Sequence, residues 1–357
     1  MHPAEPEMSR IPDDKLAEYS HRVKGKVLVI TGAGAGIGRQ TALLFASYGA
    51  KVVIGDLNPD AALTVVDEIE KAGGFRLSPF ATHRTAACIK CNVVKFEEQV
   101  DMFEFAIKKY GSVDIVVPNA GITETAKFMT PVLENGRPKQ PKTTTLDVNL
   151  TGVLWTAHLA VHYLFVNKQP TDDLKSLIFI GSVASWQAIP LGELYTASKH
   201  AVLGLMRSLH PTLGARGVRV GCIHPFFVET NIVPFVVKVA LAGIPFVPIE
   251  RVAGAIFNAA TDPDPKTSGS AYLLLDDGHA FRVPKEQFKM GVYQMIDERA
   301  NAAQAAFKGV QKWRYITRDV WSLVGKPVVK FAVVVVAAKY AYENRELIEN
   351  YVRSFIN

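Results

Sequence analysis

Tyr195 and Lys199 are a pair of side chains whose types and spacing could do acid–base chemistry. They stand four residues apart in the segment 193–210, which has helical periodicity, so both side chains are expected on one face of a helix. A free tyrosine, with a pKa of about 10, is too weakly ionised at neutral pH to accept a proton, and a lysine ammonium beside it would favour the ionised form. On its own, such a pair is more often structural or solvated than catalytic.

A glycine-rich run supplies a second chemical feature. Residues 31–38 read Thr-Gly-Ala-Gly-Ala-Gly-Ile-Gly, directly after an apolar run with strand character and directly before a helical segment. Glycines there let the backbone turn tightly and approach a pyrophosphate, whose charge is held by amide N–H groups and the helix N-terminus. The run does not match G-x-G-x-x-G and instead fits T-G-x-x-x-G-x-G, which indicates a dinucleotide site.

Asp56 decides which dinucleotide is expected. It ends the second predicted strand, 24 residues after Gly32, near the ~20-residue separation at which an acidic side chain accepts hydrogen bonds from the adenosine ribose. A carboxylate would repel a 2′-phosphate, and the neighbouring Leu57 and Ala35 are apolar. NAD is therefore favoured over NADP. The alternative is that Asp56 is an ordinary turn residue before Asn58.

The elements that must position these residues follow from the apolar pattern. Continuous apolar runs bounded by turn residues alternate with helix-period segments such as 38–49 and 96–111, which is typical of a parallel sheet with helices on both faces. We expect an α/β fold, a Rossmann-type doubly wound parallel sheet of about seven strands. The expected strands are 26–32, 51–56, 87–93, 113–119, 176–182, 218–225 and 271–278.

Three parts are expected along the chain: a polar N-terminal segment (1–20), an NAD-binding catalytic domain (21–281) and a basic, apolar and mainly helical C-terminal extension (282–357). Residues 122–145 are polar and contain proline, so they are interpreted as a long loop after the fourth strand. The boundary is placed near residue 281 because the strand and helix pattern changes there.

From the glycine-rich run to about residue 280, the chain resembles the superfamily of short-chain dehydrogenases and reductases. The resemblance rests on the T-G-x-x-x-G-x-G run, on Tyr195 and Lys199, on Ser182 at the family's 13-residue separation from Tyr195, and on Asn149. It implies that Tyr195 removes the hydroxyl proton while hydride moves to the nicotinamide. It also implies that Lys199 holds the nicotinamide ribose, Ser182 positions the substrate oxygen and Asn149 orders a water.

The resemblance also supplies the remaining cofactor contacts. Pro118 departs from the family's pattern, and Phe226 replaces its usual glycine, which would narrow the pocket or tilt the following loop. The expected cofactor-binding residues are Gly32, Gly34, Gly36, Ile37, Gly38, Asp56, Asn92, Asn119, Gly121, Tyr195, Lys199, Pro225 and Thr230.

A lipophilic secondary alcohol or ketone is the expected substrate. Trp186, Phe226 and Phe227 are candidate pocket residues. The segment 231–250, which by resemblance closes over the substrate, is almost wholly apolar. The likeness is to NAD-linked members that oxidise hydroxylated lipids and natural products. The alternative is that Phe235, Leu241 and Phe246 of this segment pack in the core or in a subunit contact.

Three other functions remain open. One is an NADP-dependent ketoreductase of the same family, and another is a non-catalytic scaffold that keeps the nucleotide fold, against which the four matching catalytic positions argue. The third is an epimerase or dehydratase acting on sugar nucleotides, whose T-G-x-x-G-x-x-G run is not met because position 35 is Ala35.

Composition limits the partners. The net charge of +6 belongs to residues 282–357, which hold 13 basic and 7 acidic side chains, so the catalytic part has no basic surface for nucleic acid. Three cysteines are interpreted as thiols, no metal site is expected, and His200 and His224 are interpreted as structural. No secretory signal is found, so a cytoplasmic protein is expected. By resemblance it would be a homodimer or homotetramer.

The extension allows two interpretations. Lysines interrupt its apolar stretch before the roughly 17–25 residues of a membrane span are reached. Residues 313–342, with Trp313, Trp321 and flanking basic side chains, would suit a helix lying in a membrane interface. Packing on the domain or on a partner subunit is the other interpretation.

Overall fold

The computed structural model describes residues 8–73, 85–126, 128–168, 174–230, 243–288, 313–314, 317, 321 and 325–345. The chain forms two compact units, Met1–Lys289 and Met290–Asn357. The first unit contains the sheet, and the second contains the helix α10 (Lys326–Glu343). Among the described residues, no helix combines the length and apolar character that crossing a membrane requires.

A nine-stranded sheet forms the centre of the first unit, in the order β1-β11-β10-β9-β8-β5-β2-β3-β4. Its strands are β1 (Ser9–Ile11), β2 (Val27–Thr31), β3 (Lys51–Asp56), β4 (Ala86–Lys90), β5 (Ile115–Val117), β8 (Ser176–Ile180), β9 (Arg219–Pro225), β10 (Ala271–Leu274) and β11 (Ala280–Val283). The stretch from β10 to β4 is parallel, whereas β11 pairs antiparallel with both β10 and β1.

The expected parallel sheet is confirmed, but the count of about seven strands is too low. The two additional strands are β1 and β11, and each has only three or four residues at one edge of the sheet. Short edge strands lack the continuous apolar run that marks a strand buried on both faces. β1 lies inside the segment interpreted as a polar terminus, and β11 runs across residue 281.

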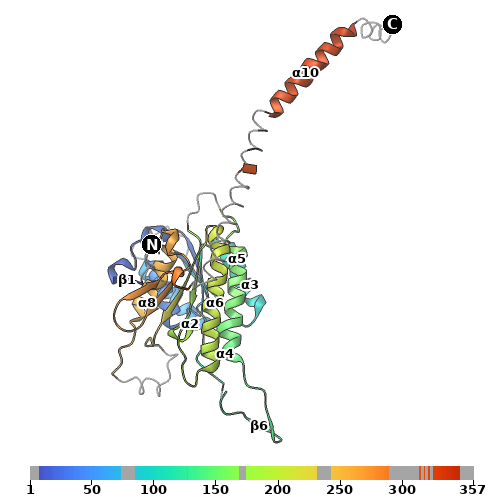
Figure 1. Cartoon of the computed structure of the whole chain (residues 1–357). Helices are drawn as coiled ribbons and strands as arrows, with labels where there is room; N and C mark the ends of the chain where they lie inside the picture. The colour runs from blue at the N-terminus through green and yellow to red at the C-terminus, as the bar shows by residue number, and fades with distance from the viewer. Residues whose placement is uncertain are drawn as a thin grey trace, which may run out of the picture. The chain divides into compact units, whose positions relative to one another are not determined.

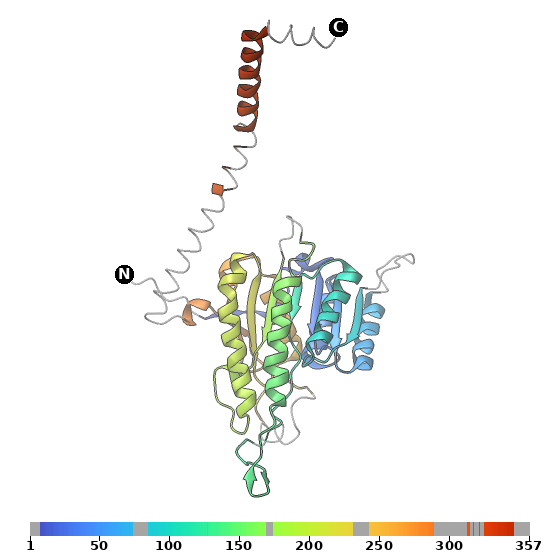
Figure 2. The ribbon, with the colours of Figure 1, turned by 90° about the vertical axis from the view of Figure 1, so that its right-hand side faces the viewer.

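Helices cover both faces of the sheet (Figure 1, and turned in Figure 2). Among the described residues, the α-helices of the first unit are α1 (Gly36–Ser47), α2 (Pro59–Gly73), α3 (Phe96–Tyr110), α4 (Thr144–Leu146), α5 (Val153–Tyr163), α6 (Glu193–Ala215) and α8 (Ile249–Thr261). Shorter helical turns are η1 (Asp13–Lys15), η2 (Ser20–Val23), η3 (Asp147–Gly152), η4 (Val183–Ser185), η5 (Pro265–Thr267) and η6 (Lys285–Phe288).

Two apolar cores lie on opposite faces of the sheet because strand side chains alternate. In β2, which is buried throughout, Leu28 and Ile30 belong to one core and Val29 belongs to the other. α1, α2 and α8 pack over the first core, whereas α3, α5 and α6 pack over the second. Burial on both faces holds the strands in one register, so their carboxyl ends share one edge.

Residues 122–145 contain more structure than the expected loop. β6 (Leu133–Glu134) and β7 (Arg137–Pro138) form a small hairpin, visible below the sheet in Figure 1. Asn135 and Gly136 turn the chain with φ of 52° and 77°. An Asn-Gly pair with both residues at positive φ is the preferred turn of a two-residue hairpin. The Asn135-Gly136 pair in the sequence therefore indicates a hairpin at this place.

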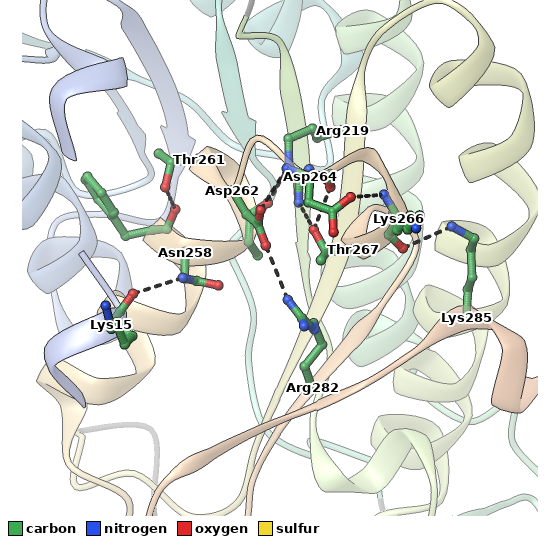
Figure 3. A network of polar contacts seen from close by, with 12 residues as sticks. Lys15, Arg219, Asn258, Thr261, Asp262, Asp264, Lys266, Thr267, Arg282 and Lys285 are labelled. Carbon is green, nitrogen blue, oxygen red and sulfur yellow. Dashed lines mark hydrogen bonds and ion pairs between the residues drawn. The ribbon is translucent and has the colours of Figure 1, made fainter. Parts of the chain in front are cut away.

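A polar network ties the antiparallel edge to the parallel sheet (Figure 3). Arg219 of β9 donates to the carbonyl oxygens of Ala259 and Asp264 and to the Thr267 hydroxyl, at 3.2, 2.8 and 2.8 Å. Arg282 of β11 pairs with Asp262 at 3.2 Å. These contacts satisfy carbonyl groups in the last turn of α8 and just after it, and they tie β11 to the same segment.

Candidate active site

The glycine-rich turn joins β2 to α1 at the carboxyl edge of the sheet. Gly32 and Gly36 have φ of +65° and +58°, which favour glycine. A Cβ added to Gly38 would lie 2.5 Å from both the side-chain nitrogen of Asn119 and the carbonyl oxygen of Gly32, so no larger residue fits there. The N-cap of α1 is Ala35, which offers no side-chain acceptor to the first N–H groups of the helix. The turn therefore fits a pyrophosphate.

Asn119 and Gly121 lie in the loop that follows β5, and Asn119 contacts the glycine-rich turn. The Asn119 amide nitrogen donates to the carbonyl oxygens of Thr31 and Gly32, both at 2.9 Å, and its backbone N–H donates to the Thr31 hydroxyl at 3.0 Å. Gly121 lies against Asn149, since an added Cβ would be 3.3 Å from Oδ1 of Asn149. The side chain of Asn119 thus holds the turn rather than projecting from it, whereas Ile37 packs against the core.

Asp56 faces the glycine-rich turn from the end of β3. Its Oδ2 accepts a hydrogen bond from the Gly34 N–H, and its Oδ1 accepts one from the Asn58 N–H, both at 2.8 Å. The nearby cation Arg39 is paired with Glu68 at 2.5 Å. The carboxylate thus orders the turn that follows β3 and also lies beside the glycine-rich turn.

The other expected cofactor residues lie on the same edge. Asn92 follows β4, where its side-chain oxygen accepts from the Val94 N–H at 3.2 Å. Pro225 ends β9, and the Phe226 N–H continues the pairing by donating to the Leu274 carbonyl oxygen at 2.8 Å. Thr230 faces the glycine-rich turn, since a Cβ on Gly36 would lie 3.5 Å from its methyl group.

Ser182, Tyr195 and Lys199 come from two adjacent elements. Ser182 follows β8 and caps η4, where its hydroxyl oxygen accepts from the Ala184 N–H at 3.1 Å. Tyr195 lies in the first turn of α6, which packs on η4. Lys199 is buried one turn later; its ammonium donates to the Ile180 carbonyl oxygen at 3.0 Å and lies 5.6 Å from the centre of the Tyr195 ring.

Asn149 is fully buried in η3, a π-helical stretch that precedes α5. Its Oδ1 accepts from the Ile122 N–H and its Nδ2 donates to the Ile122 carbonyl oxygen, both at 2.8 Å. Such π-helical stretches frequently occur at functional sites. The side chain of Asn149 thus holds the loop that follows β5, a contact that the sequence did not predict.

His224 supports Ser182 from behind. Its Nδ1 donates to the Ser182 carbonyl oxygen at 3.0 Å, and its Nε2 is buried with no hydrogen-bond partner among the described residues. Burial lowers the pKa of His224 to about 3; the bond to Ser182 opposes the shift and the charge of Lys199 adds to it. The ring is therefore neutral at physiological pH, which matches the structural interpretation. Within the described part of the chain, the hydrogen bond of the His200 ring is to its own helix, at the Thr196 carbonyl oxygen.

The candidate pocket residues pack against other rings. Trp186 lies 5.5 Å from His224 and 5.3 Å from Phe288 between ring centres. Phe226 packs against the core and lies 4.8 Å from Phe227. Residues 231–242 of the apolar segment lie outside the described residues, so the structure describes only part of the expected lining.

The cysteines supply no ready nucleophile. Cys88, Cys91 and Cys222 are free thiols. Burial raises the pKa of Cys91 and of Cys222 to about 12, and it also raises the pKa of Cys88. In the part of the chain that the structure describes, no group of three or more metal-ligating side chains is present.

Glu124, in the loop after β5, was missed by the sequence analysis. Its carboxylate accepts hydrogen bonds from the backbone N–H groups of Leu194 and Tyr195 at 2.7 and 2.9 Å. The two partners are 70 and 71 residues away along the chain, so no local spacing could have revealed the contact. The sequence offered one signal, an acidic residue three positions after the Asn119-Ala120-Gly121 motif.

His224 makes a testable contribution to stability. Its pKa is lower in the folded protein than in the unfolded chain, so the unfolded state takes up a proton first as the pH falls below about 6.5. We expect this group to lower the free energy of unfolding by about 1.4 kcal/mol per pH unit between pH 6 and 5. Urea denaturation at several pH values measures the slope. His224→Gln should flatten it, and an unchanged slope in that variant would contradict this assignment.

Comparison with known proteins agrees with the geometry of the site. The family model for short chain dehydrogenase matches residues 26–238. Tropinone reductase-like 2 from Erythroxylum coca is 35% identical over 59% of this chain and 70% of its own length. The mitochondrial borneol dehydrogenase from Lavandula x intermedia is 32% identical over 58% of this chain and 71% of its own length.

A solved structure shows the same fold. The crystal structure of a short-chain type dehydrogenase/reductase from Mycobacterium marinum aligns with a TM-score of 0.61 and 26% identity, over 74% of this chain and 98% of that chain. The family match includes the glycine-rich turn and the four expected catalytic positions, and from this match we conclude that the protein is an oxidoreductase of the short-chain dehydrogenase family.

Proposed function

We propose that the chain is an NAD-dependent oxidoreductase that interconverts a lipophilic secondary alcohol and its ketone, with Asn149, Ser182, Tyr195 and Lys199 as its catalytic residues. The observation that carries the proposal is the buried ammonium of Lys199, 5.6 Å from the Tyr195 ring and bonded to the end of the strand that leads to Ser182. This places a cation beside the phenol that would exchange the proton with the substrate.

In this reaction the nicotinamide, when bound, accepts or returns the hydride. Tyr195 takes the hydroxyl proton during oxidation and returns it to the ketone oxygen during reduction. The Ser182 hydroxyl holds the substrate oxygen in place, which contributes through positioning. Lys199 supplies the positive charge beside Tyr195, and Asn149 holds the backbone of Ile122 in the loop that follows β5.

The contacts of Asp56 support NAD over NADP. Its carboxylate lies 2.8 Å from the Gly34 N–H, so a 2′-phosphate would approach a negative charge. The Arg39 guanidinium is already paired with Glu68 and would have to leave that partner to hold a phosphate. The opposite preference, an NADP-dependent ketoreductase, would need both contacts to rearrange.

Apolar rings near Ser182 support a lipophilic substrate. Trp186 is more than one third exposed and contacts His224, and Phe226 and Phe227 directly follow the end of β9. A relative bears the name of borneol dehydrogenase, and borneol is an apolar secondary alcohol. We propose an alcohol or ketone of this class, without a charged group, as the small-molecule partner.

Replacing Asp56 tests the choice of cofactor. In Asp56→Ser, the repulsion of a 2′-phosphate and the acceptor for the ribose are both removed, so kcat/KM is expected to fall roughly 10–100-fold with NAD and to rise with NADP. Initial rates with both dinucleotides and a panel of secondary alcohols measure the change. Asp60→Asn, an exposed carboxylate near the start of α2, is the matched control. Equal use of NAD and NADP by the unchanged enzyme would refute the preference.

We also propose a homodimer or homotetramer as the assembly of the first unit. α5 leaves Leu154 exposed on its outer side, and an apolar helix surface of this kind suits a contact with a second copy. Light scattering after size exclusion measures the assembly, and a monomer at micromolar concentration would overturn the proposal.

For the second unit we propose contact with an anionic membrane surface. In α10, apolar side chains are exposed all along the helix, including Val328, Phe331, Val334 and Tyr340. Lys326, Lys330 and Lys339 are distributed among them. Apolar burial and attraction of lysines to acidic lipid add together at a membrane interface.

Vesicle flotation tests the contact with the full-length protein. We expect binding to vesicles that contain phosphatidylserine, and weaker binding to phosphatidylcholine alone. Lys326→Glu, Lys330→Glu and Lys339→Glu together should abolish binding to the acidic vesicles, since each lysine contributes about 1 kcal/mol. If the full-length protein floats with neither kind of vesicle, the proposed membrane contact is wrong. Packing of α10 on the domain or on a partner subunit is then the interpretation that stands.

A further inference from the structure

The Glu124 carboxylate joins two parts of the proposed site. Its Oε2 accepts from the N–H groups of Leu194 and Tyr195 at 2.7 and 2.9 Å, and its Oε1 accepts from those of Ala126 and Thr125 at 2.9 and 3.0 Å. Both oxygens of one half-buried side chain are thus committed to backbone donors. One of those donors belongs to Tyr195 itself.

α6 begins without a cap of its own. Its N-cap is Gly192, which makes no side-chain hydrogen bond to the first turn. The first N–H groups of a helix need outside acceptors, and a negative charge is favourable at that end. Glu124 supplies both from a distant loop, so the start of α6 is fixed to the segment that follows β5 rather than to its own preceding residues.

The opposite side of the same loop is held by the segment that carries Asn149. The Thr145 hydroxyl lies 3.3 Å from the Thr123 carbonyl oxygen and 3.4 Å from Oε1 of Glu124. Asn149 then holds the backbone of Ile122 through two hydrogen bonds of 2.8 Å. The loop from Ile122 to Glu124 therefore lies between the Asn149 segment and the Tyr195 helix and is bonded to both.

We infer that Glu124 is a positioning residue that sets the place of Tyr195 relative to Asn149 and Ser182. The inference deepens the function proposed above and rests on it. Ser182 is fixed independently, by its place after β8 and by its bonds within η4. Releasing the start of α6 would therefore move the phenol relative to the serine, and a displacement of about 1 Å at a reacting group can cost about 100-fold in rate.

The charge state of Glu124 agrees with this role. Burial alone would raise the pKa of its carboxyl, but the backbone N–H groups of Ala126, Tyr195, Leu194 and Thr125 outweigh that effect and lower the pKa. The group is ionised at neutral pH, and charge-assisted hydrogen bonds are stronger than neutral ones.

Glu124→Gln is the variant that tests the inference, with Glu193→Gln as the matched control. Glutamine has the same shape, but its amide nitrogen would face N–H donors, so part of the contact with the backbone is lost. Glu193 is a carboxylate at the first position of α6, for which the described part of the chain shows no hydrogen bond to that helix's amides. The control removes an equal charge at the same helix end.

Three quantities are measured on the full-length protein: kcat and KM with NAD and a turned-over alcohol, the Kd of NADH from its fluorescence, and amide hydrogen exchange of the peptide that spans Leu194 and Tyr195. For Glu124→Gln we expect kcat to fall roughly 10–100-fold, with the Kd of NADH within about twofold, and faster exchange confined to the start of α6. Glu193→Gln should stay within about twofold in every quantity.

The inference is overturned if Glu124→Gln keeps a kcat within twofold of the unchanged enzyme, or if Glu193→Gln loses as much. Should Glu124→Gln fail to fold, it is replaced by Glu124→Asp, which keeps the charge on a shorter side chain. For Glu124→Asp we likewise expect a lower kcat and an unchanged Kd of NADH. A failure of the proposed function is distinguishable, because the unchanged enzyme would then turn over no alcohol. The exchange experiment tests the contact of Glu124 independently of turnover, and unaltered exchange would overturn it.

Discussion

Burial of a parallel sheet on both faces is the constraint on which the rest of the structure depends. Side chains of β2 alternate between two apolar cores, so the strand cannot shift by one residue without exchanging them. Parallel strands held in register bring their carboxyl ends to one edge. The glycine-rich turn, Asp56, Ser182 and Pro225 all follow or end such strands. At the amino ends of β8 and β5, a buried ion pair of 2.8 Å joins Lys175 to Asp114.

The loop after β5 connects the two chemical halves of that edge. Asn119 holds the backbone of the glycine-rich turn, Ile122 is held by Asn149, and Glu124 reaches the start of α6. A stretch of few residues thus contacts the dinucleotide turn, the π-helical stretch and the helix of Tyr195. Each of these contacts joins a side chain of one segment to a backbone N–H or C=O group of another. The geometry of the site therefore depends on the path of the backbone as well as on the side chains.

Much of the fold could be predicted because strands buried on both faces leave continuous apolar runs. The runs at 26–32, 176–182 and 218–225 correspond to β2, β8 and β9. β1 and β11 could not be found in this way, since each is short and its pairing partners lie far away in the sequence or in an unexpected direction. Residue types and spacings pointed to Asp56 and to Tyr195 with Lys199, whereas Ser182 and Asn149 needed the family resemblance.

The contacts of the candidate site were less predictable than its members. Nothing in the sequence indicates that the Asn119 and Asn149 side chains hold backbone groups of other segments, because such bonds depend on where distant loops meet. The same reason applies to His224, whose neutral ring follows from burial behind Ser182 rather than from its neighbours in the sequence.

The central claim is that Tyr195 transfers the proton while the bound nicotinamide exchanges hydride with an alcohol. Absorbance at the reduced-nicotinamide band, followed with NAD and a panel of lipophilic secondary alcohols, tests it most directly when the unchanged enzyme is compared with Tyr195→Phe. We expect reduction of NAD by the enzyme and a rate at least about 100-fold lower in the variant, with NADH still bound. Turnover that survives in Tyr195→Phe, or NAD binding without turnover of any alcohol or ketone, would contradict the account.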